Sequence, residues 1–215
     1  MQAALAVVVA VGTGVLTAAC SASSGSSTPP ASPGTSVRVL TLERETPTPI
    51  GQAVALTLAS RDQEAGKITL AVSGFNLTNT LSANTQGFSG VSGRIGWDVA
   101  LLEPDALDSG DFLRQGGASV NCCRQSTAAA EAIPGTYPFL VVRGDDTRLM
   151  GSGELFLIRL RPVQGVTSGT STIRFIEEVQ NRGGFPFTAA VVLSPFNPTR
   201  GSTVEHVYGG TVTIR

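Results

Sequence analysis

The sequence predicts an all-β fold, an antiparallel β-sandwich, on three observations. Short runs that alternate apolar and polar residues recur along most of the chain, rich in Val, Ile, Thr and aromatic residues and bounded by Gly, Pro, Asn and Asp. Segments with helical periodicity are almost absent, and no internal repeat of solenoid or propeller length occurs. Many short strands with few helices are typical of two packed antiparallel sheets.

The first three predicted strands show the alternation most clearly. They cover residues 52–60, 67–73 and 94–101. Their apolar positions on one face are Val54, Leu56 and Leu58, then Ile68, Leu70 and Val72, then Ile95, Trp97, Val99 and Leu101. Later strands are predicted at 137–142, 154–161, 171–177, 189–193 and 211–214. We expect a shared core that contains Trp97, Val99, Leu101, Phe156, Ile158 and Leu160.

Helical character is confined to two short segments. Residues 104–108 begin with Pro104, and residues 126–132 begin with Ser126, a plausible N-cap. Each segment is only one or two turns long, so neither changes the predicted fold class.

The first 35 residues predict export. Residues 3–19 are small and apolar without interruption, and this run is shorter than the roughly 20 residues of a membrane-spanning helix, so residues 1–19 are predicted to be a signal peptide. The run ends in LTAAC, which resembles the lipobox of bacterial lipoproteins, where the cysteine, here Cys20, is acylated and becomes the N-terminus. No Lys or Arg precedes Arg38, so the usual positive n-region is missing. The alternative is an ordinary secretory signal with a chance cysteine at its end.

The predicted organisation follows from this signal. Residues 20–35 hold the lipidated Cys20 and a Ser/Pro-rich tether, a composition that stays solvated, and residues 36–215 form one folded domain. We expect a lipid anchor to hold the domain at the cell membrane, on the extracellular or periplasmic face.

Two further cysteines, Cys122 and Cys123, are adjacent in the sequence. Export places them in an oxidising compartment, so a vicinal disulfide between them is one interpretation. Two free or partly buried thiols are about equally favoured, and intermolecular pairing comes third. Adjacent cysteines lack the spacing that brings two thiolates to one tetrahedral ion, which disfavours a metal site.

Composition argues against several function classes. The net charge is −1, from 15 basic and 16 acidic residues without any block of like charge, which disfavours nucleic acid as a partner. The single histidine, His206, would have to be the base of a Ser-His-Asp or Cys-His enzyme, but no GxSxG motif is present and a surface position is favoured. We therefore predict no catalytic residue, no metal site and no cofactor. Paired carboxylates of the glycosidase type stay open, because the separations of the sixteen acids are unknown.

Two local motifs have an ordinary interpretation. Glu103, Asp105, Asp108 and Asp111 fall in EPDALDSGD, which is predicted to be a loop. Such oxygen donors could ligate Ca²⁺, but the segment lacks the DxDxDG alternation of a calcium loop, so a solvated turn is favoured. Residues 143–145 spell RGD, and a tight turn followed by Asp146 accounts for these residues equally well.

Three blocks of the sequence resemble the cohesin domain and the related carbohydrate-binding-module-like sandwiches. Residues 90–107, GVSGRIGWDVALLEPDAL, are similar to the cohesin turn, strand and DPxxL corner, with Glu103 where that corner usually has Asp. Residues 151–161, GSGELFLIRLR, are similar to the "GdGxLaxixF" strand, and STIRF follows at 171–175. Residues 209–214, GGTVTI, are similar to the closing strand.

The resemblance implies a sandwich of about nine strands with jelly-roll topology. It also implies a non-catalytic binding or scaffolding module at the cell surface, with a dockerin-like protein or a polysaccharide as the partner. Two other hypotheses stay open: a small glycan-active enzyme or accessory protein that uses two acids, and a structural envelope lipoprotein without a discrete ligand. Residues 114–135 form a longer insertion than the cohesin pattern has, and we expect this loop to distinguish the protein. The residues that contact the partner cannot be assigned from the motifs.

Overall fold

The computed structural model describes residues 38–78, 87–122, 135–145, 147–182, 185–194 and 202–215. They all belong to one compact unit, Ser36–Arg215. The predicted signal peptide, Cys20, the tether, Cys123 and the predicted helix at 126–132 lie outside the described residues. Within the described ranges, no helix is long and apolar enough to cross a membrane.

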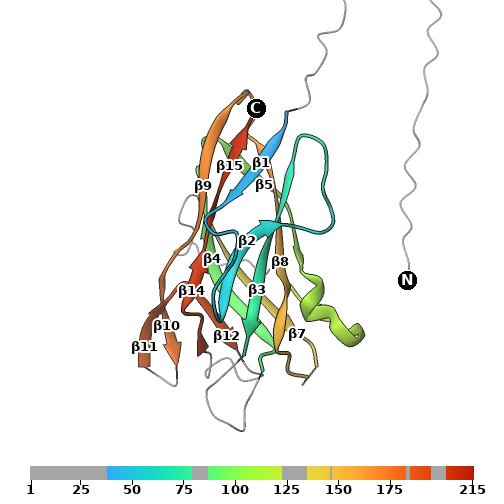
Figure 1. Ribbon diagram of the computed structural model, residues 1–215, viewed down its shortest axis with the longest axis vertical. Helices are drawn as coiled ribbons and strands as arrows, with labels where there is room; N and C mark the ends of the chain where they lie inside the picture. The colour runs from blue at the N-terminus through green and yellow to red at the C-terminus, as the bar shows by residue number, and fades with distance from the viewer. Residues whose placement is uncertain (1–37, 79–86, 123–134, 146, 183–184, 195–201) are drawn as a thin grey trace, which may run out of the picture. The chain divides into compact units, whose positions relative to one another are not determined.

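One of the two main sheets has five strands in the order β14-β2-β3-β8-β5 (Figure 1). Neighbouring strands are antiparallel, except that β14 runs parallel to β2. The bounds are Ala53–Leu58 for β2, Ile68–Leu77 for β3, Leu102–Ser109 for β5, Gly151–Pro162 for β8 and His206–Tyr208 for β14. The alternation that predicted β2 and β3 directs Val54, Leu56, Ile68, Leu70 and Val72 into the core.

The other main sheet has eight strands, with β1-β15-β9-β4-β12-β13 as its path, while β7 pairs with β4 and β6. The bounds are Leu40–Arg44 for β1, Gly90–Gly96 for β4, Val120–Asn121 for β6, Thr136–Arg143 for β7, Gly169–Phe175 for β9, Val191–Ser194 for β12, Ser202–Thr203 for β13 and Gly210–Ile214 for β15. These pairings are all antiparallel.

A hairpin of two further strands, β10 (Glu178–Arg182) and β11 (Phe185–Ala189), leaves the eight-stranded sheet between β9 and β12. β9 pairs with residues 95 and 96 of β4, and β12 pairs with residues 90–93 on the same strand. β9 and β12 therefore occupy one strand position beside β4, and the hairpin is an insertion into it. The hairpin projects away from the body of the sandwich at the lower left of Figure 1.

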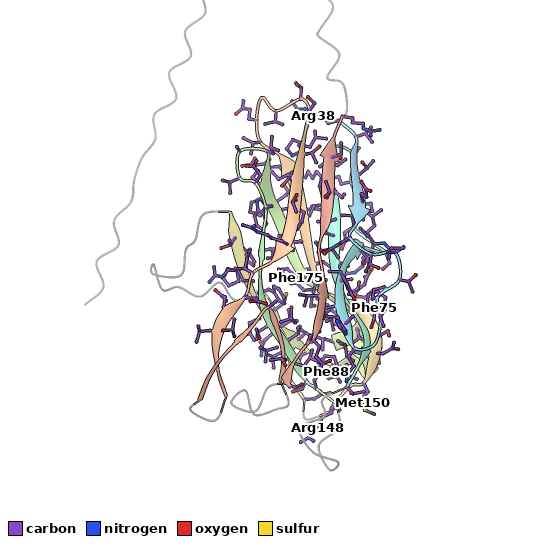
Figure 2. The ribbon with its side chains drawn as sticks, turned by 60° about the vertical axis from the view of Figure 1, so that its left-hand side comes forward. Arg38, Phe75, Phe88, Arg148, Met150 and Phe175 are labelled. Atoms are coloured by element: carbon purple, nitrogen blue, oxygen red, sulfur yellow. The ribbon has the colours of Figure 1, made fainter. Side chains whose placement is uncertain are left out.

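The core lies between the two main sheets, where side chains fill the space (Figure 2). Phe156 is at its centre and stacks on Phe139, with ring centroids 5.1 Å apart, and on Tyr137, at 6.3 Å. Trp97 is 9% exposed, and its Nε1 donates a hydrogen bond of 3.0 Å to the carbonyl of Leu102. The predicted core positions Trp97, Phe156, Ile158 and Leu160 are confirmed as buried.

The antiparallel β-sandwich is confirmed, but the strand number of about nine is corrected, since fifteen strands are present in the described residues. The difference has a structural reason. β6, β10, β11, β13 and β14 are short additional strands, and β9 and β12 are two halves of one position. If the five short strands are left out and β9 and β12 are counted as one, nine strand positions remain in the two main sheets.

The predicted strand at 94–101 is wrong in its second half, because β4 ends at Gly96. Asp98 makes a turn there: its side chain accepts a hydrogen bond from the backbone N–H of Ala100, and its carbonyl accepts from Leu101 and Leu102. Val99, predicted to be in the core, is 52% exposed, and Leu101 is only partly buried against the core.

The predicted helix at 104–108 is also wrong, because these residues belong to β5. β5 lies at the edge of its sheet and pairs with β8 around a bulge between Pro104 and Ala106. An edge strand tolerates proline, since the missing N–H faces away from the partner strand. The helix that does form is the 3-10 segment η1, Asp111–Gly117, which together with β6 shortens the predicted loop at 114–135.

Candidate functional site

The connection between β2 and β3, residues 59–67, folds back over the outer face of the five-stranded sheet. Ala59 packs on Ala71 and Leu157 there, apart from the main core. The backbone N–H of Ser60 donates to a carboxylate oxygen of Glu154 at 2.7 Å, and the Ser60 hydroxyl donates to the other oxygen at 3.0 Å. These contacts fix the connection above strands β3 and β8.

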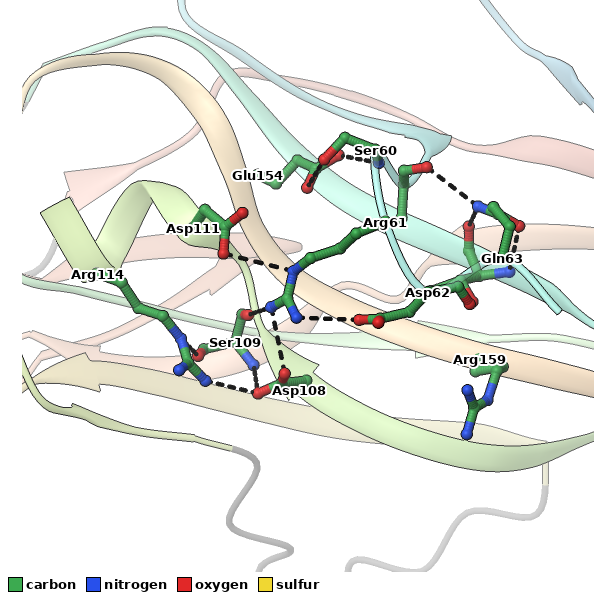
Figure 3. Close-up of polar contacts among 12 residues, drawn as sticks. Ser60, Arg61, Asp62, Gln63, Asp108, Ser109, Asp111, Arg114, Glu154 and Arg159 are labelled. Carbon is green, nitrogen blue, oxygen red and sulfur yellow. Dashed lines mark hydrogen bonds and ion pairs between the residues drawn. The ribbon is translucent and has the colours of Figure 1, made fainter.

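Arg61 from this connection is the centre of an ion-pair cluster (Figure 3). Its guanidinium lies 3.0 Å from the carboxylate of Asp62, 3.2 Å from that of Asp108 and 3.4 Å from that of Asp111. Arg114 from η1 also bonds Asp108, at 2.8 Å. The cluster therefore ties three segments of the chain together at the edge of the sheet.

A second group of ion pairs lies further along β5 and β8. The ammonium of Lys67 is 2.9 Å from Glu64 and 3.0 Å from Asp105, and Nε of Arg159 donates to Asp105 at 2.7 Å. The hydrogen bond from Lys67, with that from Arg159, holds the pKa of Asp105 below its ordinary value. A pocket of about 260 Å³ lies beside these groups, and its lining includes Leu157.

These contacts correct the prediction of a solvated acidic loop. Glu103, Asp105 and Asp108 lie on β5 and Asp111 begins η1, and each has an arginine or lysine partner. No three His, Cys, Asp or Glu residues are grouped for a metal ion in the described part of the chain. Of these acids, Asp105 has a pKa lowered by its cation partners, and a carboxyl group with a lowered pKa is a poor general acid.

The RGD sequence is not an exposed loop tip. The side chain of Arg143, at the end of β7, is 2% exposed and donates to the carbonyls of Leu113 (2.8 Å) and Gln115 (3.0 Å). It also bonds both carboxylate oxygens of Asp145, at 2.8 and 2.7 Å, which lowers the pKa of that group. Arg143 therefore fastens η1 to the sheet, while the predicted neighbour Asp146 lies outside the described residues.

Two other predicted positions are placed by the structure. His206 is exposed, as expected, and its ring stacks on Tyr208 with centroids 6.4 Å apart. Cys122 is half-buried and disulfide-bonded. The other two cysteines, Cys20 and Cys123, lie outside the described residues, so the vicinal pair stays a prediction.

The outer face of β12, β4 and β7 differs in character from the charged face. Val192, Ser92 and Leu140 are register partners across the three strands, and Leu140 is 41% exposed. Half-buried Pro138 and Val142 flank it on β7. Arg94, which points outward from β4, is only 3% exposed. Sequence reasoning did not assign this surface, although the absence of charge from residues 137–142 was a signal for it.

No protein-family profile and no curated protein matches the sequence. Solved structures that are similar to the chain include cohesin domains of types I and II.

Three examples give the extent of the likeness. A non-cellulosomal cohesin from the archaeon Archaeoglobus fulgidus is 10% identical, with a TM-score of 0.40 over 67% of this chain and 78% of that chain. A type II cohesin from Acetivibrio cellulolyticus is 15% identical, with a TM-score of 0.43 over 75% and 92% of the two chains. A type I cohesin from Clostridium thermocellum, solved in complex with a dockerin, is 17% identical, with a TM-score of 0.44 over 74% and 96%.

Proposed function

We propose that this chain is a non-catalytic binding module at the cell surface that captures a protein partner through the outer face of β12, β4 and β7. One observation carries the proposal: Leu140 is 41% exposed and no described residue of β12, β4 or β7 has an exposed charged side chain, whereas ion pairs cover the outer face of the other sheet. The centres of protein interfaces are depleted of charge and contain a few dominant apolar contacts, so the uncharged face is the better candidate.

The proposed type of partner comes from the sequence. The three blocks at residues 90–107, 151–161 and 209–214 resemble cohesin, which implies a partner of the dockerin type. The described strands support the same use, because a rigid sheet holds Leu140, Ser92 and Val192 in fixed register and little conformational entropy is lost on binding.

The non-catalytic part of the proposal is supported by the acids. A glycan-active enzyme needs one protonated carboxyl group near an ionised one. In the Arg61 and Lys67 groups, the acids instead contact arginine and lysine. A structural envelope lipoprotein without a ligand is the remaining alternative, and the binding experiment below separates it from the module proposed here.

We also propose that the module is exported and held by a lipid on Cys20. The apolar run before this cysteine and the Ser/Pro tether after it support the assignment.

The test measures binding of dockerin-type modules from the source organism to the immobilised protein. Leu140→Asp should weaken binding on the order of tenfold or more, because it places a charge at the centre of the interface. Leu58→Asp is the matched control, since Leu58 is 53% exposed but lies on β2 of the other sheet. Equal binding by both variants would place the partner elsewhere. The absence of binding by the wild type would favour the structural alternative.

A further inference from the structure

A notch opens in the outer face of the eight-stranded sheet where β4 stops between its two neighbours. β4 ends at Gly96, opposite Arg174 of β9, and the chain turns away at Trp97 and Asp98. β9 runs on past this point, with Thr172 and Thr170 beyond the last β4 residue. The resulting pocket has a volume of about 510 Å³, within the range of small-molecule sites.

Glycine makes this geometry attainable on the β7 side. Gly135, directly before β7, has φ +76°, and a Cβ there would lie 2.8 Å from the carbonyl oxygen of Trp97. Its own carbonyl accepts a hydrogen bond of 2.8 Å from the Trp97 N–H. A larger residue would push β7 away from the turn, so the close approach that forms one wall of the notch requires glycine.

The residues that line the notch include hydrogen-bond donors and hydrogen-bond acceptors. Its lining includes Arg174, Asp98, Thr136, Thr170 and Thr172. Arg174 is exposed and makes no ion pair with any described residue. Asp98 is also exposed, and its carboxylate accepts only from the N–H of Ala100 among the described groups.

This pattern differs from that of the arginines in the ion-pair groups described above. Arg61, Arg114, Arg143 and Arg159 all have carboxylate partners. Among the described residues that line the notch, Arg174 and Asp98 are open to a ligand, and their charges balance. The complement of such a site is a neutral molecule with many groups that both donate and accept hydrogen bonds.

The surface beside the notch continues the same chemistry. On the outward side of β9, β15 and β1, one row holds Thr172, Thr211 and Glu43, and a second row holds Thr170, Thr213 and Thr41. Adjacent strands place these side chains about 4.8 Å apart, and alternate residues along a strand are about 6.7 Å apart. The notch therefore opens onto rows of threonine hydroxyl and methyl groups, with the exposed Glu43 on β1 at the far end of the first row.

We infer that the notch and the threonine rows bind a neutral polysaccharide chain. One sugar unit occupies the notch, where Arg174 and Asp98 bond its hydroxyls. Neighbouring units lie across the threonine rows, whose hydroxyls match a polymer of hydroxyl groups and whose methyl groups meet the sugar C–H faces. This site does not include Leu140 on β7. The protein partner and the polysaccharide would therefore contact different residues of the module.

The test uses the full chain in a detergent without a sugar head group. Soluble xylan, mannan and mixed-linkage glucan are the neutral probes, polygalacturonate is the acidic probe, and affinity is measured by calorimetry. Arg174→Ala should weaken binding of a neutral polymer on the order of tenfold, because it removes charge-assisted hydrogen bonds, and Thr172→Val should weaken it several-fold. Both side chains are exposed, so both variants should fold.

Two controls match these variants. Arg148→Ala removes an arginine at the lower end of the sandwich in Figure 2, well below Phe175, the residue after Arg174. Thr203→Val removes an exposed hydroxyl on β13. Both should bind like the wild type, and so should Leu140→Asp. The inference is overturned if no neutral polymer binds, if Arg174→Ala and Thr172→Val bind as well as the controls, or if only polygalacturonate binds.

Discussion

Nε of Arg94 donates a hydrogen bond to a carboxylate oxygen of Glu178, the first residue of the β10–β11 hairpin. The side chain of Arg94 is 4% exposed, and Nη1 also donates to the hydroxyl of Thr136 at 3.0 Å. This contact occurs where the chain leaves the strand position shared by β9 and β12, next to the bond from the Ile176 N–H to the Arg94 carbonyl. The buried cation thus holds the base of the inserted hairpin against β4.

Glu178→Gln should therefore destabilise the domain. The substitution removes the carboxylate from a buried guanidinium, and hydrogen bonds to charged groups contribute about 1.5–3 kcal/mol to the free energy of unfolding. Urea denaturation followed by tryptophan fluorescence measures the change. Glu177→Gln is the control, because Glu177 is exposed and makes no ion pair with the described residues. Equal stability of the two variants would show that the hairpin is held by other contacts.

The pKa of Asp105 predicts sensitivity to acid. Its folded pKa lies below the ordinary value of 3.8, first because of Lys67 and then because of Arg159. A lowered pKa stabilises the fold above the unfolded-state value, and this stabilisation is lost as the pH falls through the folded-state value. Asp105→Asn should thus lower the unfolding free energy at pH 7 and reduce its fall below about pH 4. Exposed Glu205, changed to Gln, is the control for urea unfolding at both pH values.

The strands could be predicted from the sequence because their signal is local. Alternating apolar residues between turn residues predicted β2, β3, β7, β8, β9 and β15 within a few residues. Val99 was predicted wrongly because it continues the alternation of β4, whereas the side chain of Asp98 bonds the backbone of Ala100 and turns the chain. The hydrogen bond between the Asp98 side chain and the backbone therefore favours a turn here, although the alternation of apolar residues continues through Val99.

The surfaces could not be predicted, because they depend on register. Arg61 and Asp108 are 47 residues apart, and only the fold-back of residues 59–67 brings them together. Leu140 and Ser92 share a face only after β7 and β4 pair. The alternating threonines of TVTI and GTSTI were visible, but their rows across β15 and β9 require the strand order of the sheet.

Acylation of Cys20 is a prediction about residues outside the sandwich. Two acyl chains on one cysteine anchor a protein far more firmly than one chain does. Metabolic labelling with a palmitate analogue in the source organism should mark the wild type and leave Cys20→Ser unlabelled. Equal labelling of both would contradict the lipobox interpretation and favour an ordinary secretory signal.

Truncation of a core residue should destabilise the domain far more than truncation of Val99. Phe156 is fully buried between Phe139 and Tyr137, so Phe156→Ala should lower the free energy of unfolding by about 3–5 kcal/mol. Val99→Ala should change it by no more than about 0.5 kcal/mol, since Val99 is 52% exposed in a turn. Thermal melts of the two variants test the assignment of the strand end at Gly96. A severe loss from Val99→Ala would restore the longer strand.

Arg143 gives the sharpest test of how η1 is attached. Its planar guanidinium bonds two carbonyls of η1, those of Leu113 and Gln115, and the carboxylate of Asp145 at the same time. Lysine keeps the charge but cannot span these acceptors, because its donors are on a single nitrogen. Arg143→Lys should therefore cost about 1–3 kcal/mol in urea unfolding, and hydrogen exchange should rise first in η1. Arg148→Lys, on an exposed arginine, controls for the change of residue type. If Arg143→Lys matched this control in both measurements, the charge of Arg143 alone, and not its fork of donors, would hold η1.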